Sequence, residues 1–176
     1  MIILTGMPGA GKEEFVSVAV KLGYAVVRMG DIVREYTQKE GLEVNSKNVS
    51  MVAQRERDLH GEDIWARRTV ERVRKLGDKV VIDGTRSLAE VEVFKRELND
   101  VFIVAILASP KTRYERIKRR GRKDDIMSYE EFVERDMREL RWGVGNVIAL
   151  ADYYLVNESS LEEFHKNVEN FLKNKN

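Results

Sequence analysis

The chain has 176 residues, of which 35% are charged and 43% are hydrophobic, and its formal net charge is only +1. A chain of this length is expected to form one domain with its own core, and the lack of cysteine excludes disulfide scaffolds and thiolate metal sites. The balanced charge gives no overall attraction to nucleic acid or anionic lipid, so no nucleic-acid partner is expected.

Five short apolar runs, each bounded by Gly, Asp or Pro, predict strands that are buried on both faces of a sheet. They occupy residues 2–5, 25–29, 80–82, 101–107 and 153–156. The longest apolar stretch, residues 101–108, is far shorter than the ~20 residues of a membrane-spanning helix. Residues 1–4 are typical of a strand rather than of a secretory leader. We therefore expect a cytoplasmic protein with no membrane partner.

Amphipathic helical patterns separate the predicted strands. Apolar residues recur at helical spacing over residues 15–22, 66–73 and 88–98. Capping boxes, in which Ser is followed three residues later by Glu, predict helices that begin after Ser87, Ser128 and Ser160. Strands that alternate with helices predict an α/β fold, a five-stranded parallel sheet with helices on both faces, and ligands are then expected at the carboxyl ends of the strands.

The residues between the first strand and the first helix form a glycine-rich loop, Gly6-Met7-Pro8-Gly9-Ala10-Gly11-Lys12. Glycines at this spacing allow successive backbone amides to point at an anion, and the N-terminus of the following helix adds its positive dipole. Lys12 is placed to reach the β and γ phosphates of a nucleotide. The spacing and its position between strand and helix predict a Walker A loop that binds ATP and ends at Glu13.

The hydroxyl that usually follows the Walker A lysine and binds Mg²⁺ is replaced here by Glu13 and Glu14. A carboxylate is itself a hard ligand that suits Mg²⁺, so Glu13 is a candidate metal ligand. Asp83, at the end of the third strand, is a second candidate ligand for Mg²⁺ or its waters. The alternative is that Glu13 turns outward or weakens the site.

Two further segments begin where parallel strands end and a ligand is expected. Asp31 and Arg34 follow the second strand, and Asp83 and Arg86 follow the third. Each arginine can form a bidentate contact with phosphate oxygens. Asp31 or Asp83 can orient an acceptor or accept a hydroxyl proton. These residues predict an acceptor site next to the phosphate loop, formed with a helical region at about residues 31–76.

Residues 111–123 form a strongly basic segment, in which eight of thirteen residues are Lys or Arg. Arg113, Arg116 and Arg120 are spaced so that they lie on one face of a helix, and Arg122 follows a glycine. The pattern predicts a short lid over the phosphates at about residues 111–126, with Arg116, Arg120 and Arg122 as its phosphate ligands. A solvated helix face and a nucleic-acid patch are the two alternatives.

An apolar stripe runs along the next predicted helix. It consists of Tyr129, Phe132, Val133, Met137 and Leu140, with Asp136 on the same face. The stripe is typical of a helix that packs on a core. An acid within such a stripe needs a partner, so Asp136 either pairs with a neighbouring arginine or lies in water at the edge of the stripe.

At these motifs the sequence resembles the adenylate kinases. Residues 29–34 resemble their Ser-Thr-Gly-Asp-Met-Leu-Arg segment, and residues 83–86 resemble their Asp-Gly-Phe-Pro-Arg. Both arginines hold the phosphate of AMP in that family, and the resemblance implies this role for Arg34 and Arg86. Residues 122–125 are similar to the Arg-Lys-Asp-Asp that follows the adenylate kinase lid, although the long lid insertion is absent from this sequence.

Residues 151–163 look instead like the last strand and helix of dephospho-CoA kinases. Over nearly the whole chain, the sequence most resembles uncharacterised archaeal proteins that are related to adenylate kinase and dephospho-CoA kinase. The resemblance implies the P-loop NTPase fold of the nucleoside monophosphate kinases, with both ATP and Mg²⁺ bound.

The motifs and the resemblance together predict transfer of the γ-phosphoryl group of Mg·ATP to a nucleotide-type acceptor such as AMP. Lys12, Asp83 and Arg122 are the expected catalytic residues. Two alternatives remain open at this point. One is dephospho-CoA kinase or another small-molecule kinase, and the other is a regulator that binds AMP or ATP without turnover.

Overall fold

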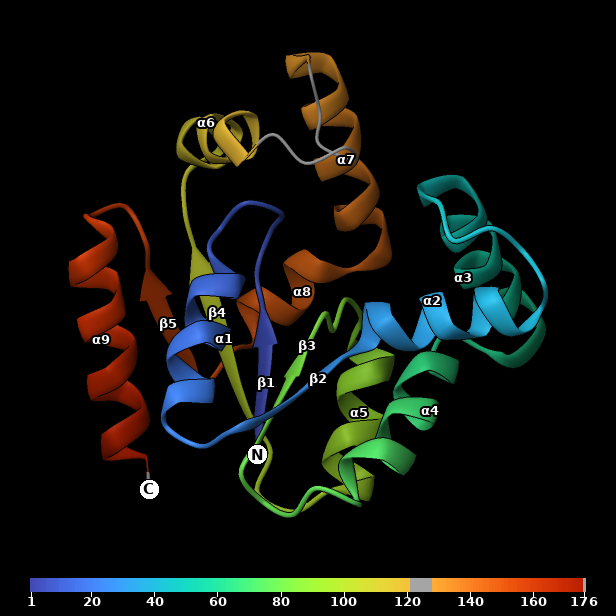
Figure 1. Ribbon diagram of the computed structural model, residues 1–176, viewed down its shortest axis with the longest axis horizontal. Helices are drawn as coiled ribbons and strands as arrows, with labels where there is room; N and C mark the ends of the chain where they lie inside the picture. Colours follow the sequence, from blue (N-terminus) through green and yellow to red (C-terminus); the bar gives the residue numbers. More distant parts are fainter. Residues whose placement is uncertain (121–127, 176) are drawn as a thin grey trace.

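Five parallel strands form one sheet in the computed structural model, which describes residues 1–120 and 128–175 (Figure 1). The strands are β1 (Ile2–Thr5), β2 (Ala25–Arg28), β3 (Val80–Asp83), β4 (Phe102–Leu107) and β5 (Tyr153–Val156). Their order in the sheet is β2-β3-β1-β4-β5, and every neighbouring pair is parallel. The predicted five-stranded parallel sheet is therefore confirmed.

Helices cover both faces of this sheet (Figure 1). Helices α1 and α9 pack on one face, while α4, α5 and α8 pack on the other, together with parts of α2 and α3. The described helices are α1 (Lys12–Lys21), α2 (Met29–Lys39), α3 (Ser46–His60), α4 (Ile64–Val73), α5 (Leu88–Glu97), α6 (Pro110–Arg120), α7 (Tyr129–Trp142), α8 (Val144–Ala149) and α9 (Leu161–Asn174).

Alternate residues of the inner strands contribute to two separate cores, because successive side chains of a strand point to opposite faces. Ile3 of β1 belongs to the core under α4 and α5, whereas Ile2 and Leu4 belong to the core under α1 and α9. Both faces are covered, so the inner strands are apolar rather than alternately apolar and polar, except for Thr5 and Asp83 at the carboxyl ends of β1 and β3.

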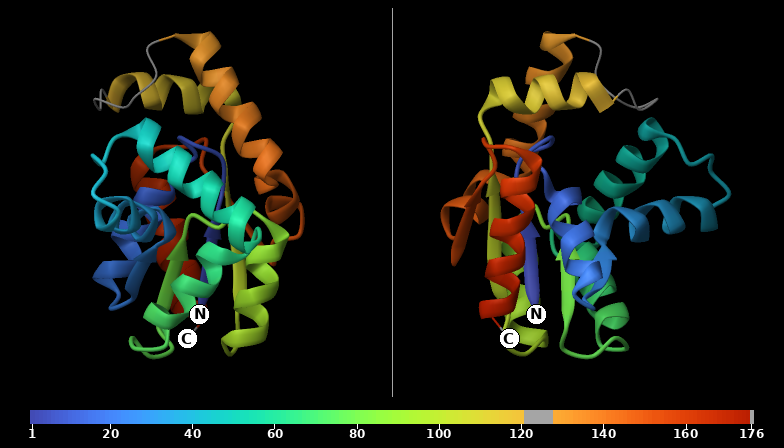
Figure 2. Two further views of the ribbon diagram at one scale, coloured as in Figure 1. Left: turned by 90° about the vertical axis from the view of Figure 1, so that its right-hand side faces the viewer. Right: turned by 60° about the vertical axis from the view of Figure 1, so that its left-hand side comes forward.

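The register places the ends of the central strands side by side. Leu4 of β1 lies opposite Asp83 of β3 and opposite Val104 of β4. The loop that follows β1 and the turn that follows β3 therefore meet at the carboxyl edge of the sheet. Helices α6 and α7 lie beyond that edge, while both chain termini lie at the opposite end (Figures 1 and 2).

Most predicted boundaries agree with the structure, and the differences are local. Met29 begins α2 instead of ending the second strand. The capping boxes at Ser87 and Ser128 form completely. At Ser160 the hydroxyl accepts a hydrogen bond from the Glu163 backbone, but a reciprocal bond from the Ser160 backbone N–H to the Glu163 carboxylate is not among those of the described residues.

The apolar stripe on α7 is the larger difference. Phe132 is only 1% exposed and packs against Ile117. The other four apolar residues of the stripe are between 40% and 52% exposed, which contradicts the predicted core position for Tyr129, Val133, Met137 and Leu140. The physical reason is the position of α7, which stands beyond the strand ends and so has no sheet face to cover (Figure 1).

Within the ranges that the structure describes, we find no helix with the length and apolar character required to cross a lipid bilayer. This agrees with the short apolar runs of the sequence.

Candidate active site

The loop between β1 and α1 depends on glycine for its shape. Gly9 and Gly11 have φ angles of +81° and +110°, in the region that side-chain-bearing residues rarely adopt. A Cβ atom on Gly11 would lie 2.1 Å from Nδ2 of Asn157, and one on Gly9 would lie 2.9 Å from the carbonyl oxygen of Arg113. The loop is therefore held against α6 and against the segment that follows β5.

Lys12 begins α1 and folds back over this loop. Its Nζ atom donates to the carbonyl oxygens of Gly6 at 2.6 Å and Met7 at 3.3 Å. Burial lowers the pKa of Lys12, while Asp83 and then Glu139 favour its charged form. A bound phosphate would add a further negative charge and stabilise the ammonium group.

Asp83 ends β3 and is 9% exposed. Its Oδ1 atom has no hydrogen-bond partner among the described residues. Burial raises the pKa of Asp83, although Lys12 acts in the opposite direction. A buried carboxylate oxygen without a donor is costly unless a cation or a water molecule supplies the missing contact. The hard oxygen of Asp83 therefore fits a Mg²⁺ ion.

We expect Asp83→Asn to raise the melting temperature at neutral pH. The folded state raises the pKa of Asp83, so it binds a proton more readily than the unfolded chain. The stability contributed by this group is thus present at low pH and is lost as the pH rises through the folded-state pKa. The gain from the amide should be largest at pH 7–8 and should disappear below about pH 4, where the unfolded aspartate is also protonated.

Thermal unfolding of both proteins between pH 4 and pH 8 measures this difference. Asp78→Asn, at an exposed position in the turn before β3, is the matched control and should leave the melting temperature unchanged. A lower melting temperature for Asp83→Asn at pH 8 would show that the buried carboxylate stabilises the fold.

The two carboxylates that replace the Walker A hydroxyl both have basic side chains as partners: Glu13 forms an ion pair and Glu14 contacts a histidine ring. Oε2 of Glu13 lies 3.0 Å from Nη2 of Arg28, and Oε2 of Glu14 lies 2.7 Å from Nε2 of His165. Glu13 also contributes to the raised pKa of Asp83, so the two predicted metal ligands share one region. The described residues contain no cluster of three or more acidic or histidine side chains suited to a metal ion. Of these two candidates, Asp83 is the one with a buried oxygen that has no hydrogen-bond partner among the described residues.

The acceptor-side residues lie in two different environments. Asp31 and Arg34 are in the first turns of α2, where their side chains pair with each other at 2.8 Å and are each about half exposed. Arg86 lies in the turn between β3 and α5, and its Nε donates to Oε2 of Glu139 at 2.8 Å. Its guanidinium carbon is 5.1 Å from the centroid of the Trp142 ring.

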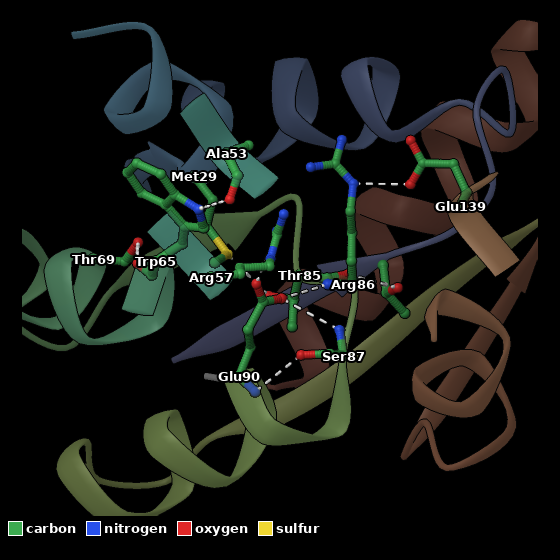
Figure 3. A network of polar contacts seen from close by, with 11 residues as sticks. Met29, Ala53, Arg57, Trp65, Thr69, Thr85, Arg86, Ser87, Glu90 and Glu139 are labelled. Carbon is green, nitrogen blue, oxygen red and sulfur yellow. Dashed lines mark hydrogen bonds and ion pairs between the residues drawn. The ribbon is translucent and has the colours of Figure 1, made fainter. Parts of the chain in front are cut away.

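Figure 3 shows that the two terminal nitrogens of Arg86 point away from Glu139. The positive charge of Arg86 also acts on both Lys12 and Asp83, lowering the pKa of each. The structure therefore brings Lys12, Asp83 and Arg86 into one electrostatic neighbourhood. Asp31 and Arg34 do not belong to this group, because they form a separate, exposed pair.

Glu90 is predicted only as a capping residue, yet it is the centre of a buried network that fixes Arg86 (Figure 3). It is 1% exposed and accepts hydrogen bonds from the backbone nitrogens of Arg86 at 2.7 Å and Ser87 at 3.2 Å. Arg57 of α3 lies 3.5 Å away as its ion-pair partner. Burial raises the pKa of Glu90, while the two backbone donors and Arg57 oppose that effect.

Arg57 and Glu139 were not predicted as site residues. The capping box marks Glu90 in the sequence, but no local pattern marks either of these partners. Arg57 reaches the Arg86 turn from α3, and Glu139 reaches it from α7, so both contacts join segments distant in sequence.

Arg113 does not present its guanidinium group to the phosphates, which corrects the expected row of three arginines on α6. Its side chain is buried and forms two hydrogen bonds with Asp136, one of them at 2.8 Å, and one to the carbonyl oxygen of Pro8 at 3.0 Å. Arg113 thus connects α7 to the phosphate loop. Of the two alternatives for Asp136, the structure shows the first, because the carboxylate pairs with Arg113 instead of lying in water.

Arg116 reaches the phosphate loop through an intermediate residue. Its Nη2 donates to Oδ1 of Asn157 at 3.2 Å, and Nδ2 of Asn157 donates to the carbonyl oxygen of Ala10 at 2.8 Å. The Nη1 atom of Arg116 is buried without a hydrogen-bond partner in the described part of the chain. Arg120 ends α6, whereas Arg122 and the rest of the predicted lid up to residue 126 lie outside the described residues.

Comparison with known families agrees with this geometry. Residues 5–133 match the family model described as AAA domain. A UPF0200 protein of Thermoplasma volcanium is 51% identical to this chain over 94% of the chain and 92% of the relative. A UPF0200 protein of Staphylothermus marinus is 46% identical over 98% of the chain and 91% of the relative.

Solved structures with the same fold include two bacterial proteins. TT1252 from Thermus thermophilus gives a TM-score of 0.67 at 19% identity, covering 99% of this chain and 97% of that one. Shikimate kinase from Bacteroides thetaiotaomicron gives a TM-score of 0.62 at 16% identity, covering 98% and 97%. At these identities the similarity concerns the fold, and it confirms the predicted P-loop kinase-like architecture.

Proposed function

This chain belongs to the UPF0200 family and to the AAA domain family, and from that premise we propose that it is a phosphotransferase. It would transfer the γ-phosphoryl group of Mg·ATP to a nucleotide-type acceptor such as AMP. The observation that carries the proposal is the cluster of Lys12, Asp83 and Arg86 at the carboxyl edge of the sheet. It combines a half-buried lysine in a glycine loop, a buried carboxylate oxygen without a donor among the described residues, and an arginine with two nitrogens pointing away from its partner.

Phosphoryl transfer requires alignment and charge neutralisation more than covalent help from the protein. The ammonium group of Lys12 would hold the β and γ phosphates together with backbone N–H groups of residues 6–12, except at Pro8, which has none, and Ala10, whose N–H donates to the carbonyl oxygen of Met7. Asp83, together with Glu13 once it leaves Arg28, would hold Mg²⁺. When bound, that ion neutralises the charge on the phosphate oxygens.

On the acceptor side, Arg86 and Arg34 would bind the acceptor phosphate, with Asp31 orienting the acceptor at the edge of the site. Helices α2, α3 and α4, within residues 31–76, would form the wall of this region in a single P-loop domain. Arg116 and Arg120 of α6, with Arg122 beyond it, would close over the transferred phosphate as a short lid and exclude water.

A second candidate function is favoured by the side-chain contacts of Glu13 and Glu14. Both side chains that replace the usual Mg²⁺-binding hydroxyl are engaged with basic residues, Arg28 and His165. A protein that binds ATP or AMP as a signal, without turnover, needs the phosphate loop but not a competent metal site.

A panel of acceptors tests the two functions. Labelled ATP and Mg²⁺ are incubated with the protein and with AMP, dephospho-CoA or shikimate, and ATP affinity is measured by calorimetry in parallel. Mg²⁺-dependent labelling of AMP or another nucleotide-type acceptor is the expected result. ATP binding without labelling of any acceptor favours the regulator, and absence of Mg²⁺-supported ATP binding would overturn both.

We expect Arg86→Gln to raise the KM for the acceptor by about 10- to 100-fold, because a charge-assisted hydrogen bond contributes roughly 1.5–3 kcal/mol. The KM for ATP should change less than threefold. Steady-state kinetics with each substrate varied in turn measures the two values. Arg96→Gln, at an exposed position on α5, is the control for loss of a positive charge. An equal rise in both KM values would place Arg86 on the ATP side.

A further inference from the structure

Strand β5 forms one edge of the sheet and differs from the strand at the other edge. It pairs with β4 on one side, and no described strand pairs with its other side (Figure 1). Three of its four residues are exposed, whereas all four residues of β2 at the opposite edge are buried or half-buried. An open edge leaves backbone N–H and C=O groups that are ready to pair with another strand.

This edge lacks the side chains that usually protect such strands. Its sequence is Tyr153-Tyr154-Leu155-Val156, with neither lysine nor proline, the residues that natural edges use to prevent pairing. Tyr153, Tyr154 and Val156 are 42%, 44% and 58% exposed. Leu150, just before the strand, is 61% exposed. The edge is thus open, apolar and favourable for strand addition.

A groove of about 830 Å³ runs between β5 and α9. One wall is rigid, because the Tyr153 ring stacks on Phe171 at a centroid distance of 4.6 Å and Phe171 in turn stacks on Phe102. The α9 side of the groove carries the amides of Asn167, Asn170 and Asn174. The groove is therefore preformed, with an apolar wall and a neutral polar wall.

The lining of the groove is nearly free of charge, although 35% of the chain is charged. Lys175 is its one charged lining residue in the described chain, and this ammonium group already lies over the Phe102 ring at 3.5 Å. If the groove carried many charges of one sign, the grooves of two copies of the chain would repel each other. Asparagine amides and tyrosine hydroxyls both donate and accept hydrogen bonds, so a surface built from them complements itself.

We propose that β5 pairs antiparallel with β5 of a second copy of this chain and forms a continuous ten-stranded sheet. A two-fold axis perpendicular to the sheet would make the same patch serve both partners. Helix α9 packs on one face of the sheet, so the axis would set the two α9 helices side by side on that face. Their asparagine rows would then meet.

The exposed side chains of the edge account for part of the area that such an interface needs. Leu150, Tyr153, Tyr154 and Val156 expose about half of their surfaces, which amounts to roughly 350 Å² per copy. A standard stable interface buries about 800 Å² per partner. The asparagine face of α9 and the open backbone of β5 supply the remaining part. The proposal concerns assembly and does not depend on the proposed phosphotransferase activity.

Light scattering with sedimentation analysis tests the proposal, because one chain has a mass of 20.4 kDa. The unmodified protein is expected at twice that mass at 50 µM. Tyr154→Lys with Val156→Lys should give the mass of one chain, with the dissociation constant raised at least 100-fold. Leu76→Lys, at a 45% exposed position after α4, is the matched control and should leave the dimer intact. Circular dichroism shows whether each variant is folded.

Cysteine cross-linking locates the interface, since the chain has no cysteine of its own. Paired antiparallel residues have Cα atoms about 4.5–5.5 Å apart, within the range that a disulfide spans. Tyr154→Cys and Val156→Cys, oxidised separately and as a mixture, should give a covalent dimer in at least one of the three samples, whereas Leu76→Cys should give none. A single-chain mass for the unmodified protein, a dimer that the lysines do not weaken, or no cross-link in any sample would each overturn the proposal.

Discussion

Lys12→Ala is expected to reduce phosphoryl transfer to background, a loss of about 1,000-fold or more. The Nζ atom of Lys12 lies inside the phosphate loop, bonded to the carbonyl oxygens of Gly6 and Met7. The substitution removes the one positively charged side chain of residues 6–12. It leaves unchanged the glycines with positive φ angles that shape the loop. Initial rates with labelled ATP, measured with the acceptor that the panel identifies, determine the loss.

The same variant separates a chemical role from a structural one. Lys12→Ala removes the donor to the carbonyl oxygens of Gly6 and Met7, so circular dichroism and thermal unfolding are measured alongside the rates to show that the variant is folded. Lys21→Ala, at the other end of α1, removes an exposed lysine from the same helix and should retain full activity. Near-normal turnover in Lys12→Ala would refute the assignment of the loop to phosphate binding in catalysis.

Arg113→Met is expected to lower the free energy of unfolding by about 3–5 kcal/mol. The substitution leaves the carboxylate of Asp136, whose side chain is only 14% exposed, without its cation. It also removes the donor to the carbonyl oxygen of Pro8. Chemical denaturation measures the change, and Arg96→Met, which breaks an exposed pair with Glu97, should cost less than about 1 kcal/mol.

A double-mutant cycle shows whether the loss comes from the unpaired charge. Asp136→Leu alone should also destabilise the fold, because it leaves the buried guanidinium group of Arg113 unpaired. The combination Arg113→Met with Asp136→Leu should recover most of the loss, since two apolar side chains can replace a buried ion pair. Losses that simply add in the double variant would show that the two residues act independently.

The candidate site follows partly from local sequence and partly from contacts between distant segments. The phosphate loop was predictable because its glycines, its lysine and the flanking strand and helix are contiguous. Arg86 was predictable because it directly follows a strand that ends beside that loop. Glu139, which bonds to Arg86, is 53 residues away in the chain, and no spacing rule connects the two.

The row of arginines on α6 illustrates the same limit. Helical spacing correctly places Arg113, Arg116 and Arg120 on one helix, but it contains no information about what that helix faces. Arg113 contacts a residue 105 positions away, and Arg116 contacts one 41 positions away. Whether an arginine binds a ligand or supports the loop was therefore decided by packing.

The apolar stripe of α7 was misjudged for a related reason. Periodicity shows that a helix has an apolar face, but that face is buried only where another element packs against it. Helix α7 lies beyond the carboxyl ends of the strands, so the sheet does not cover its apolar face. Of the five apolar residues of the stripe, only Phe132 is buried, and it packs against Ile117 of α6.

The sequence by itself determined the five strands, the glycine loop and the capped helices, because each depends on residues close together in the chain. Only the tertiary structure decided that Glu90 joins Arg57 to the Arg86 turn, that Asn157 supports the phosphate loop, and that β5 presents an open edge. These features depend on which segments meet in space. That choice results from the packing of whole elements, because a local pattern specifies a face or a charge but not its partner.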